Sequence, residues 1–221
     1  MRTAAVLPVK SFGRAKQRLD AAVEQPARIE LAAAMVGDVL AALRDVPSLD
    51  HIVVVTAEPR AARAAREAGA RVMADPVEAG QSDAAGRGVR AAVALGAERV
   101  LLVPGDCPAL DAREVGRLLG AFPDAGVVIV PDRHGSGTNA LLLTPPRVIA
   151  PSFGPGSFAR HAARGTAAGA GVRVAHAASL ELDVDTPGDL AALRDALAAL
   201  SDAAPRTRAL LERLDPSAAV A

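Results

Sequence analysis

A pair of aspartates near the end of the sequence has the residue type and spacing of a metal site. Asp183 and Asp185 are one residue apart, so an extended chain would point both carboxylates to the same face. Adjacent carboxylates repel each other unless a cation lies between them, and Mg²⁺ takes oxygen ligands of this kind. The alternative use is as a helix cap, but Thr186, Pro187 and Asp189 already form a complete helix start. The pair is therefore free to bind metal.

A further carboxylate, Asp106, lies in the turn after an apolar run that predicts a buried strand over Val100–Val103. The preceding residue, Gly105, allows close backbone approach. Asp106 could then hold Mg²⁺ together with substrate phosphates. The alternative is a turn aspartate that accepts bonds from local N–H groups. Asp111 can cap the next helix, so Asp106 is not needed for that role.

Four cations, Lys10, Arg14, Lys16 and Arg18, lie within nine residues just after the first apolar run. At the carboxyl end of a strand they could converge on a triphosphate and steady a leaving pyrophosphate. The segment contains neither the G-x-x-x-x-G-K-[ST] phosphate loop nor the G-x-G-x-x-G dinucleotide fingerprint. The alternative is a solvated basic loop.

Two glycine-rich turns could hold an anion. In the first, Asp132–Leu141, backbone N–H groups and Thr138 could bind a phosphate or carboxylate, although a plain β-turn has the same composition. The second, Phe153–His161, opens a helix for which Ser157 could be the cap, and free N–H groups at a helix start attract anions. A simple capped helix is the alternative there.

Two reactive residue types are not expected to take part in chemistry. Cys107 has no evident activating base, which favours a small core residue over a nucleophile. His134 has no visible partner that would make it a base. A single cysteine also excludes an intrachain disulfide and fits a reducing cytoplasm.

Composition excludes several classes of protein. The 25 basic and 25 acidic side chains cancel, which argues against a wholesale nucleic-acid or membrane surface. No stretch is long enough to span a bilayer. The apolar run Met1–Leu7 is short and lacks a cleavage pattern, so we expect a first strand and not a signal peptide. We expect a cytoplasmic protein with no nucleic-acid or membrane partner.

Short apolar runs alternate with longer amphipathic ones, which predicts an α/β fold with a mostly parallel sheet flanked by helices. Ligands in such sheets bind beyond the carboxyl ends of the strands, where the candidate residues above are found. The expected strands are Ala4–Val9, His51–Thr56, Arg71–Ala74, Arg99–Val103, Val127–Val130, Asn139–Leu143 and Val172–Ala175. The expected helices are Ala27–Arg44, Pro59–Ala68, Ser82–Leu95, Ala112–Gly120, Ser157–Ala168 and Pro187–Leu200.

The length of 221 residues and an apolar fraction of 51% are compatible with a single domain around one large core. We place that domain at residues 1–201. Residues 202–221 form a C-terminal tail with a short helix, Arg206–Leu214, and an end that we expect to be disordered.

Six short motifs, in this order, resemble the 2-phospho-L-lactate / phosphoenolpyruvate guanylyltransferases of coenzyme F-420 biosynthesis. The match runs from about Thr3 to Leu200. The motifs are Pro-Val-Lys, Ala-Lys-x-Arg-Leu, Gly-Asp-Cys-Pro, Gly-Thr-Asn-Ala-Leu, Phe-Gly-x-Gly-Ser and Asp-x-Asp-Thr-Pro-x-Asp-Leu. The resemblance implies a single nucleotidyltransferase-type domain, similar to the nucleotide-diphospho-sugar transferases.

The resemblance also implies a reaction, in which GTP and a small phosphorylated acid give a guanosine diphosphate-linked acid and pyrophosphate. Phosphoenolpyruvate is the favoured acceptor, with 2-phospho-L-lactate and 3-phospho-D-glycerate as alternatives, and a homodimer is left open. By analogy, Mg²⁺ is bound by Asp106, Asp183 and Asp185, and the acceptor by Thr138, Gly154 and Ser157. The nucleotide is bound by Lys10, Arg14 and Lys16, and the catalytic cations are Lys10, Lys16 and Arg18.

One stretch departs from the family pattern. Where related sequences tend to carry Gly-Leu-Asn-x-Ala, this chain has Gly-Gln-Ser-Asp-Ala at residues 80–84. The region lies near the nucleotide in relatives, so Gln81 and Ser82 become candidates for base or ribose contacts.

Two other functions remain as alternatives. A metal-dependent sugar-nucleotide glycosyltransferase shares this kind of fold, but it would leave Thr138 and Ser157 without an obvious purpose. A catalytically inactive nucleotide-binding regulator would not need to keep the cations and the aspartates.

Overall fold

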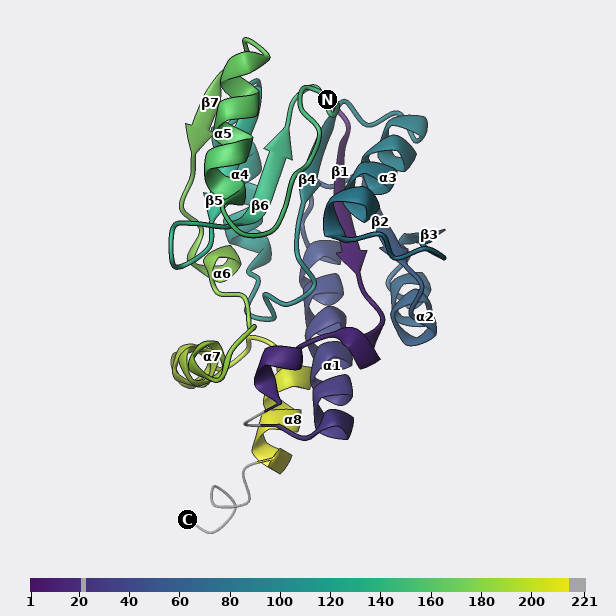
Figure 1. Ribbon diagram of the computed structural model, residues 1–221, viewed down its shortest axis with the longest axis vertical. Coiled ribbons are helices and arrows are strands. Elements are labelled where there is room, and N and C mark those ends of the chain that lie inside the picture. The colour runs from purple at the N-terminus through teal and green to yellow at the C-terminus, as the bar shows by residue number, and fades with distance from the viewer. Residues whose placement is uncertain (21–22, 215–221) are drawn as a thin grey trace.

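The computed structural model describes residues 1–20 and 23–214, and it has a seven-stranded sheet with strand order β3-β2-β1-β4-β6-β5-β7 (Figure 1). Strand β6 runs antiparallel to its neighbours β4 and β5, while the other pairs are parallel. This confirms the predicted α/β class with a mostly parallel sheet. The strands are β1 (Thr3–Val9), β2 (His51–Thr56), β3 (Arg71–Ala74), β4 (Arg99–Leu102), β5 (Val127–Pro131), β6 (Thr138–Leu143) and β7 (Val172–Val174).

The helices agree with the predicted spans to within two residues at either end. They are α1 (Gln25–Arg44), α2 (Pro59–Glu67), α3 (Gln81–Ala94), α4 (Ala112–Ala121), α5 (Ser157–Ala167), α6 (Ala178–Glu181), α7 (Pro187–Ala199) and α8 (Pro205–Leu214). The sequence pattern missed α6, which is too short to show a period. It also missed two 3₁₀ turns, Phe12–Arg14 and Gln17–Leu19, in the segment that was expected to be a plain basic loop.

Two of the predicted helix starts are confirmed by their hydrogen bonds. The Asp111 side chain accepts from the N–H groups of Arg113 and Glu114, and so caps α4. Thr186 and Asp189 form a reciprocal capping box at the start of α7. Each cap satisfies N–H groups that have no partner within the helix.

Alternate residues of the buried strands face two separate layers of helices (Figure 1). Ala5 and Leu7 of β1 pack against one layer, in which α1, α2, α4 and α6 lie. Ala4 and Val6 face the other, which α3 and α5 supply. Gly88 lets α3 approach the sheet closely, because a Cβ there would clash with Val6. Side chains that alternate in this way are what a sheet covered on both faces requires.

A third apolar cluster lies beyond the carboxyl ends of the strands, where α7 and α8 pack near α1 (Figure 1). Leu31 and Met35 of α1 are fully buried in it, together with Val184. The tail helix α8 is further anchored by Asp38 of α1, which accepts hydrogen bonds from the N–H groups of Arg206 and Thr207. The disordered end expected after α8 concerns residues 215–221, which lie outside the described residues.

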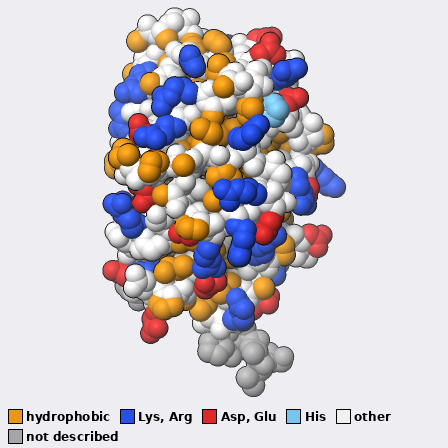
Figure 2. Space-filling model, turned by 90° about the vertical axis from the view of Figure 1, so that its right-hand side faces the viewer, with side chains coloured by type: hydrophobic (Ala, Val, Ile, Leu, Met, Phe, Trp, Pro, Cys, Tyr) orange, Lys and Arg blue, Asp and Glu red, His pale blue; other side chains and the backbone are white. Residues whose placement is uncertain are grey.

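Charged side chains of both signs are interspersed with apolar ones on the face that Figure 2 displays. This distribution is consistent with the equal totals of acidic and basic residues in the chain. Among residues 1–20 and 23–214, the helices are all too short or too polar to cross a membrane.

Candidate active site

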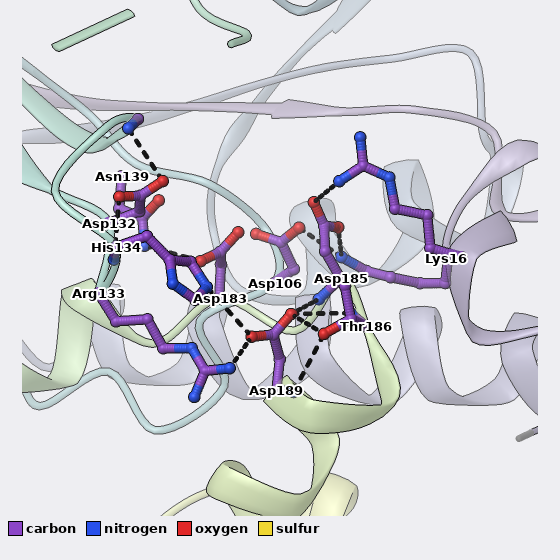
Figure 3. A network of polar contacts seen from close by, with 12 residues as sticks. Lys16, Asp106, Asp132, Arg133, His134, Asn139, Asp183, Asp185, Thr186 and Asp189 are labelled. Atoms are coloured by element: carbon purple, nitrogen blue, oxygen red, sulfur yellow. Dashed lines mark hydrogen bonds and ion pairs between the residues drawn. The ribbon is translucent and has the colours of Figure 1, made fainter. Parts of the chain in front are cut away.

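Three carboxylates from separate parts of the chain meet beyond the carboxyl ends of the central strands (Figure 3). Asp106 follows β4, while Asp183 and Asp185 lie between α6 and α7. One oxygen atom from each residue lies within 4.8 Å of the others. The structure therefore brings together the residues that the sequence proposed as metal ligands.

Val184 explains why the two aspartates beside it point the same way. Its side chain is fully buried, and its N–H group donates to the carbonyl oxygen of Asp106 at 3.1 Å. Side chains alternate along extended chain, so burying Val184 turns Asp183 and Asp185 outward together. On the other side, the Asp189 carboxylate accepts from the N–H group of Asp185 and anchors the segment to α7.

The three carboxylates are close enough for their negative charges to repel one another. Burial and the nearby charge of Asp106 raise the pKa of Asp183 to about 6, although a hydrogen bond from Asn139 partly opposes this. The Asn139 amide nitrogen lies 3.1 Å from Oδ1 of Asp183. Repulsion between converging carboxylates is relieved by a cation, so the electrostatics fit a divalent metal site.

Lys16 is the one cation of the basic segment that enters the carboxylate cluster, within the part of the chain the structure describes. Its Nζ atom lies 2.5 Å from Asp106 and 3.1 Å from Asp185. Its side chain is only 6% exposed, and burial alone would lower its pKa, but the two carboxylates outweigh burial and raise it. Lys16 has the left-handed conformation, with φ of 56°, between the two 3₁₀ turns.

The other cations of the segment lie around the rim. Arg18 is largely exposed, with its guanidinium 4.0 Å from Asp185. Arg14 is 3.7 Å from Glu78, and Lys10 is exposed. Lys10 and Arg14 line a cleft that runs from Asp106 towards the start of α3, whereas Arg18 lies outside its lining. Among these four cations, Lys16 is therefore the one that hydrogen-bonds to the carboxylates, Arg18 is a more distant partner of Asp185, and Lys10 and Arg14 lie along the cleft.

The two residues proposed as base or ribose contacts separate in the structure. Gln81 begins α3 and lines the cleft. Ser82 turns away from it, and its hydroxyl accepts a hydrogen bond from the N–H group of Phe153 at 2.9 Å. Ser82 therefore ties the start of α3 to the glycine turn before α5.

Sequence reasoning missed two acidic residues in the same cleft, Asp75 and Glu78. Asp75 directly follows β3, which is a position where polar residues collect in this fold. Glu78 has a positive φ of 46° and its side chain accepts from the N–H group of Ser11 at 2.7 Å. The signal for Asp75 was available, since the same rule had singled out Asp106.

The proposed acceptor site centres on Thr138, whose side chain contacts a buried histidine. Thr138 Oγ1 lies 3.0 Å from Nδ1 of His161, and the opposite ring nitrogen accepts from the N–H group of Ser152 at 2.8 Å. The ring proton is therefore on Nδ1 and is donated to Thr138, which leaves the Thr138 hydroxyl proton free for a ligand. Burial, reinforced by Arg160 and Arg164, lowers the pKa of His161 to about 4 and keeps the ring neutral.

The backbone of the first glycine turn is not free to bind an anion. The Asp132 carboxylate accepts from the N–H groups of His134, Ser136 and Gly137. The plain β-turn alternative is correct for these groups, and Thr138 is left as the donor. It lies beside Asn139, whose contact with Asp183 joins the two parts of the site.

The second glycine turn corrects one expectation. Ser157 is not the cap of α5; Gly156 takes that position with φ of 70°, and Ser157 is the first helical residue, buried, with its N–H group bonded to Gly154. Gly154 itself has φ of 102°, a conformation that favours glycine. The Arg160 guanidinium donates to the carbonyl oxygens of this turn and fixes its shape.

The two residues that we do not expect to take part in chemistry, Cys107 and His134, lie in different surroundings. Cys107 is fully buried, its pKa is raised by burial, and its thiol donates to the carbonyl oxygen of Leu180. His134 is mostly exposed and lies 4.0 Å from Asp189. These positions confirm Cys107 as a core residue.

Comparison with known proteins places this geometry in a wider group. The family model described as "Guanylyl transferase CofC like" matches residues 3–194. A protein of Conexibacter woesei named phosphoenolpyruvate guanylyltransferase is 49% identical over 216 residues, which are 97% of each chain. A protein of the same name from Sphaerobacter thermophilus is 37% identical over 86% of this chain and 91% of its own length.

Solved structures show the same fold at lower identity. A protein of Desulfovibrio desulfuricans G20, assigned as a nucleotide-diphospho-sugar transferase, has a TM-score of 0.76 and 19% identity, and the match covers 96% of this chain and 95% of the other. A nucleotidyl transferase of Methanothermobacter thermautotroptrophicus has a TM-score of 0.65 and 21% identity, with 89% and 98% covered. The predicted nucleotidyltransferase-type fold is confirmed.

Proposed function

The chain belongs to the CofC-like guanylyltransferase family, and on that premise we propose that it joins GTP to phosphoenolpyruvate with release of pyrophosphate. The product is a guanosine diphosphate-linked acid of the kind used in coenzyme F-420 biosynthesis. Two relatives that cover most of the chain are named for phosphoenolpyruvate, which favours this acid over 2-phospho-L-lactate and 3-phospho-D-glycerate.

The reaction needs no nucleophile from the protein. An oxygen of the acceptor phosphate attacks the α-phosphorus of GTP, and a bond forms between them. The bond from the α-phosphorus to the oxygen that bridges to the β-phosphorus breaks, and pyrophosphate leaves with that electron pair. Catalysis is then a matter of positioning two anions and offsetting their charge.

The carboxylate cluster fits a divalent cation. Asp106, Asp183 and Asp185 offer hard oxygen ligands close enough to share one ion. Burial, and after it the charge of Asp106, raises the pKa of Asp183, and a bound cation would favour its charged form. We propose Mg²⁺, which supplies charge neutralisation at the reacting phosphates when it is bound.

The basic residues complete the phosphate end of the site. In this proposal Lys16, held by Asp106 and Asp185, faces the GTP phosphates and stabilises the leaving pyrophosphate. Lys10 and Arg14, which line the cleft, steer the triphosphate and add charge at its rim. Arg18 adds charge from outside the cleft, and Gln81 contacts the nucleoside.

The acceptor lies on the other side of the carboxylates. The free hydroxyl proton of Thr138 donates to the acid, and the turn at Gly154 and Ser157 holds its remaining anionic group. Ser82 acts through Phe153, because it fixes the same turn to α3. This contact links the nucleotide side of the site to the acceptor side.

The observation that carries the proposal is the meeting of three carboxylates and Lys16 at one end of a cleft lined by further cations. The test is a panel of GTP and ATP crossed with the three acids in the presence of Mg²⁺, read by pyrophosphate release and product mass. We expect one pyrophosphate for each molecule of guanylylated phosphoenolpyruvate. A folded protein that releases pyrophosphate with no combination, or that transfers sugar from a sugar nucleotide, would overturn the proposal.

A further inference from the structure

A carboxylate at the far end of the cleft is buried, and one of its two oxygens has no hydrogen bond from any described residue. Asp75 is 5% exposed and lines the cleft, and within residues 1–20 and 23–214 its Oδ1 atom has no hydrogen-bond partner. The Nε atom of Arg87 lies 3.9 Å from it, beyond hydrogen-bond distance, while the same atom donates to Asp83 at 2.8 Å. A buried acceptor of this kind is costly unless a ligand supplies the donors.

The position of Asp75 is fixed by the fold. It directly follows β3, and its N–H group donates to the carbonyl oxygen of Thr56 at the end of β2. The α3 helix, which carries Arg87, packs against the same strands. The carboxylate is therefore held at the edge of the cleft by the sheet and not by a free loop.

The two ends of the cleft differ in what they can hold. Asp106, Asp185 and Lys16 line one end and suit the triphosphate and its cation. Asp75 and Gln81 line the other, so a nucleotide with its phosphates at the first end would place its base at the second. A carboxylate repels phosphate but accepts hydrogen bonds from a base.

We propose that Asp75 selects guanine by accepting hydrogen bonds from its N1–H and 2-amino groups. This inference rests on the proposed function, and it names the residue that gives the site its preference for GTP over other nucleotides. An ionised carboxylate is an acceptor only and can take two parallel donors. Adenine presents an unprotonated N1 at that edge and no 2-amino group, so it would leave the carboxylate without partners.

The neighbouring Glu78 is a less suitable candidate for this role. Its Oε1 atom already accepts from the N–H group of Ser11, and Oε2 lies 3.7 Å from Arg14. Both contacts hold the basic segment in place, and they lower the pKa of the Glu78 carboxyl. Among the residues that the structure describes, the Glu78 carboxylate therefore has a hydrogen-bond partner, whereas Oδ1 of Asp75 has none.

The decisive experiment replaces one oxygen of Asp75 by an amide nitrogen. Xanthine carries a carbonyl where guanine carries the 2-amino group, so Asp75→Asn should donate to xanthine and accept from its N1–H. We expect the ratio of kcat/KM for XTP over GTP to rise by roughly 100-fold or more in this variant. An unchanged ratio in the folded variant would overturn the inference.

A matched control is Asp83→Asn, which removes an acidic partner of the same arginine but lies outside the cleft lining. It should leave the XTP to GTP ratio at the wild-type value. If the control shifts the ratio as much as Asp75→Asn does, the selection belongs to Arg87 and the inference fails.

A measurement on the wild-type protein tests the same inference without any variant, so it does not depend on whether Asp75→Asn folds. Inosine triphosphate lacks only the 2-amino group, so its affinity should be roughly 10- to 100-fold weaker than that of GTP in competition binding. Equal affinities would contradict the inference. Wild-type protein that binds GTP selectively but releases no pyrophosphate with any acid would instead refute the proposed function and leave this inference standing.

Discussion

The carboxylates at the two ends of the cleft differ in whether they have a hydrogen-bond partner. At the catalytic end each carboxylate has a partner: Asp106 and Asp185 share Lys16, and Asp183 accepts from Asn139. At the far end Asp75 is buried without a hydrogen bond to Oδ1 from any described residue. A paired cluster holds its geometry by itself, whereas an unpaired group depends on a ligand. Changes at the first end should therefore abolish turnover, and changes at the second should alter selectivity.

The largest effect is expected from the three carboxylates that we propose as metal ligands. Asp106→Asn or Asp183→Asn should lower kcat by roughly 10³-fold or more, because positioned charge at the reacting phosphates is lost. The fold should persist, and Asp183→Asn should unfold at an equal or higher temperature, since it removes a carboxylate under repulsion. Pyrophosphate release and thermal unfolding measure the two quantities. Asp202→Asn, an exposed aspartate before α8, is the control. If Asp106→Asn or Asp183→Asn kept activity within tenfold of wild type, turnover would not depend on the carboxylate cluster, and the two ends of the cleft would not differ as we expect.

Lys16 should come next. Lys16→Gln removes the ammonium between Asp106 and Asp185, and kcat should fall by roughly 10²- to 10³-fold. Lys16→Arg should not restore it, because a planar guanidinium does not fit a buried site shaped for a point charge. The comparison variant is Arg18→Gln, whose exposed side chain should matter by less than about tenfold. Equal losses of kcat in Lys16→Gln and Arg18→Gln would show that the basic segment contributes only its overall positive charge, with no special role for Lys16.

A smaller and more selective effect is expected at Thr138. Thr138→Val keeps the shape of the side chain but removes the hydroxyl that we propose donates to the acid, so KM for the acid should rise by roughly tenfold. KM for GTP should stay at its wild-type value. Initial-rate kinetics with each substrate varied in turn separate the two constants. A change in KM for GTP alone would place Thr138 on the nucleotide side.

The last effect concerns how the free energy of unfolding depends on pH, and it leaves turnover at neutral pH unchanged. His161 is neutral in the folded protein because its pKa is lowered from 6.5 to about 4. Its contribution to the free energy of unfolding is therefore complete above pH 6.5 and is lost as the pH falls towards 4, because the unfolded chain binds the proton first. The full loss is roughly 3 kcal/mol. The free energy of unfolding of wild type should therefore fall faster over this window than that of His161→Gln. Asp183, whose pKa is raised from 3.8 to about 6, changes the free energy of unfolding in the opposite direction over that pH range. Its effect is present in both wild type and His161→Gln, so the difference between the two proteins does not contain it. Parallel curves would show that His161 titrates freely.

Sequence alone was sufficient for the strands, for the longer helices and for the three clustered carboxylates. Buried β-branched strands alternate with amphipathic helices, and Asp106 lies in the turn after β4, so both could be recognised from position. The selection of Lys16 among four cations could not, because it depends on a left-handed residue between two 3₁₀ turns. His161 was missed because its partner Thr138 is distant in sequence. Ser157 was misjudged as a cap, since a glycine with positive φ takes that place.

The most direct test of the account is the binding of a divalent cation to the carboxylate cluster itself. Titration of the nucleotide-free protein with Mn²⁺, followed by electron paramagnetic resonance, measures this without any turnover. The account predicts saturable binding that Mg²⁺ displaces and that is lost in the double variant Asp106→Asn with Asp183→Asn. Binding of equal affinity in wild type and in the double variant would contradict it.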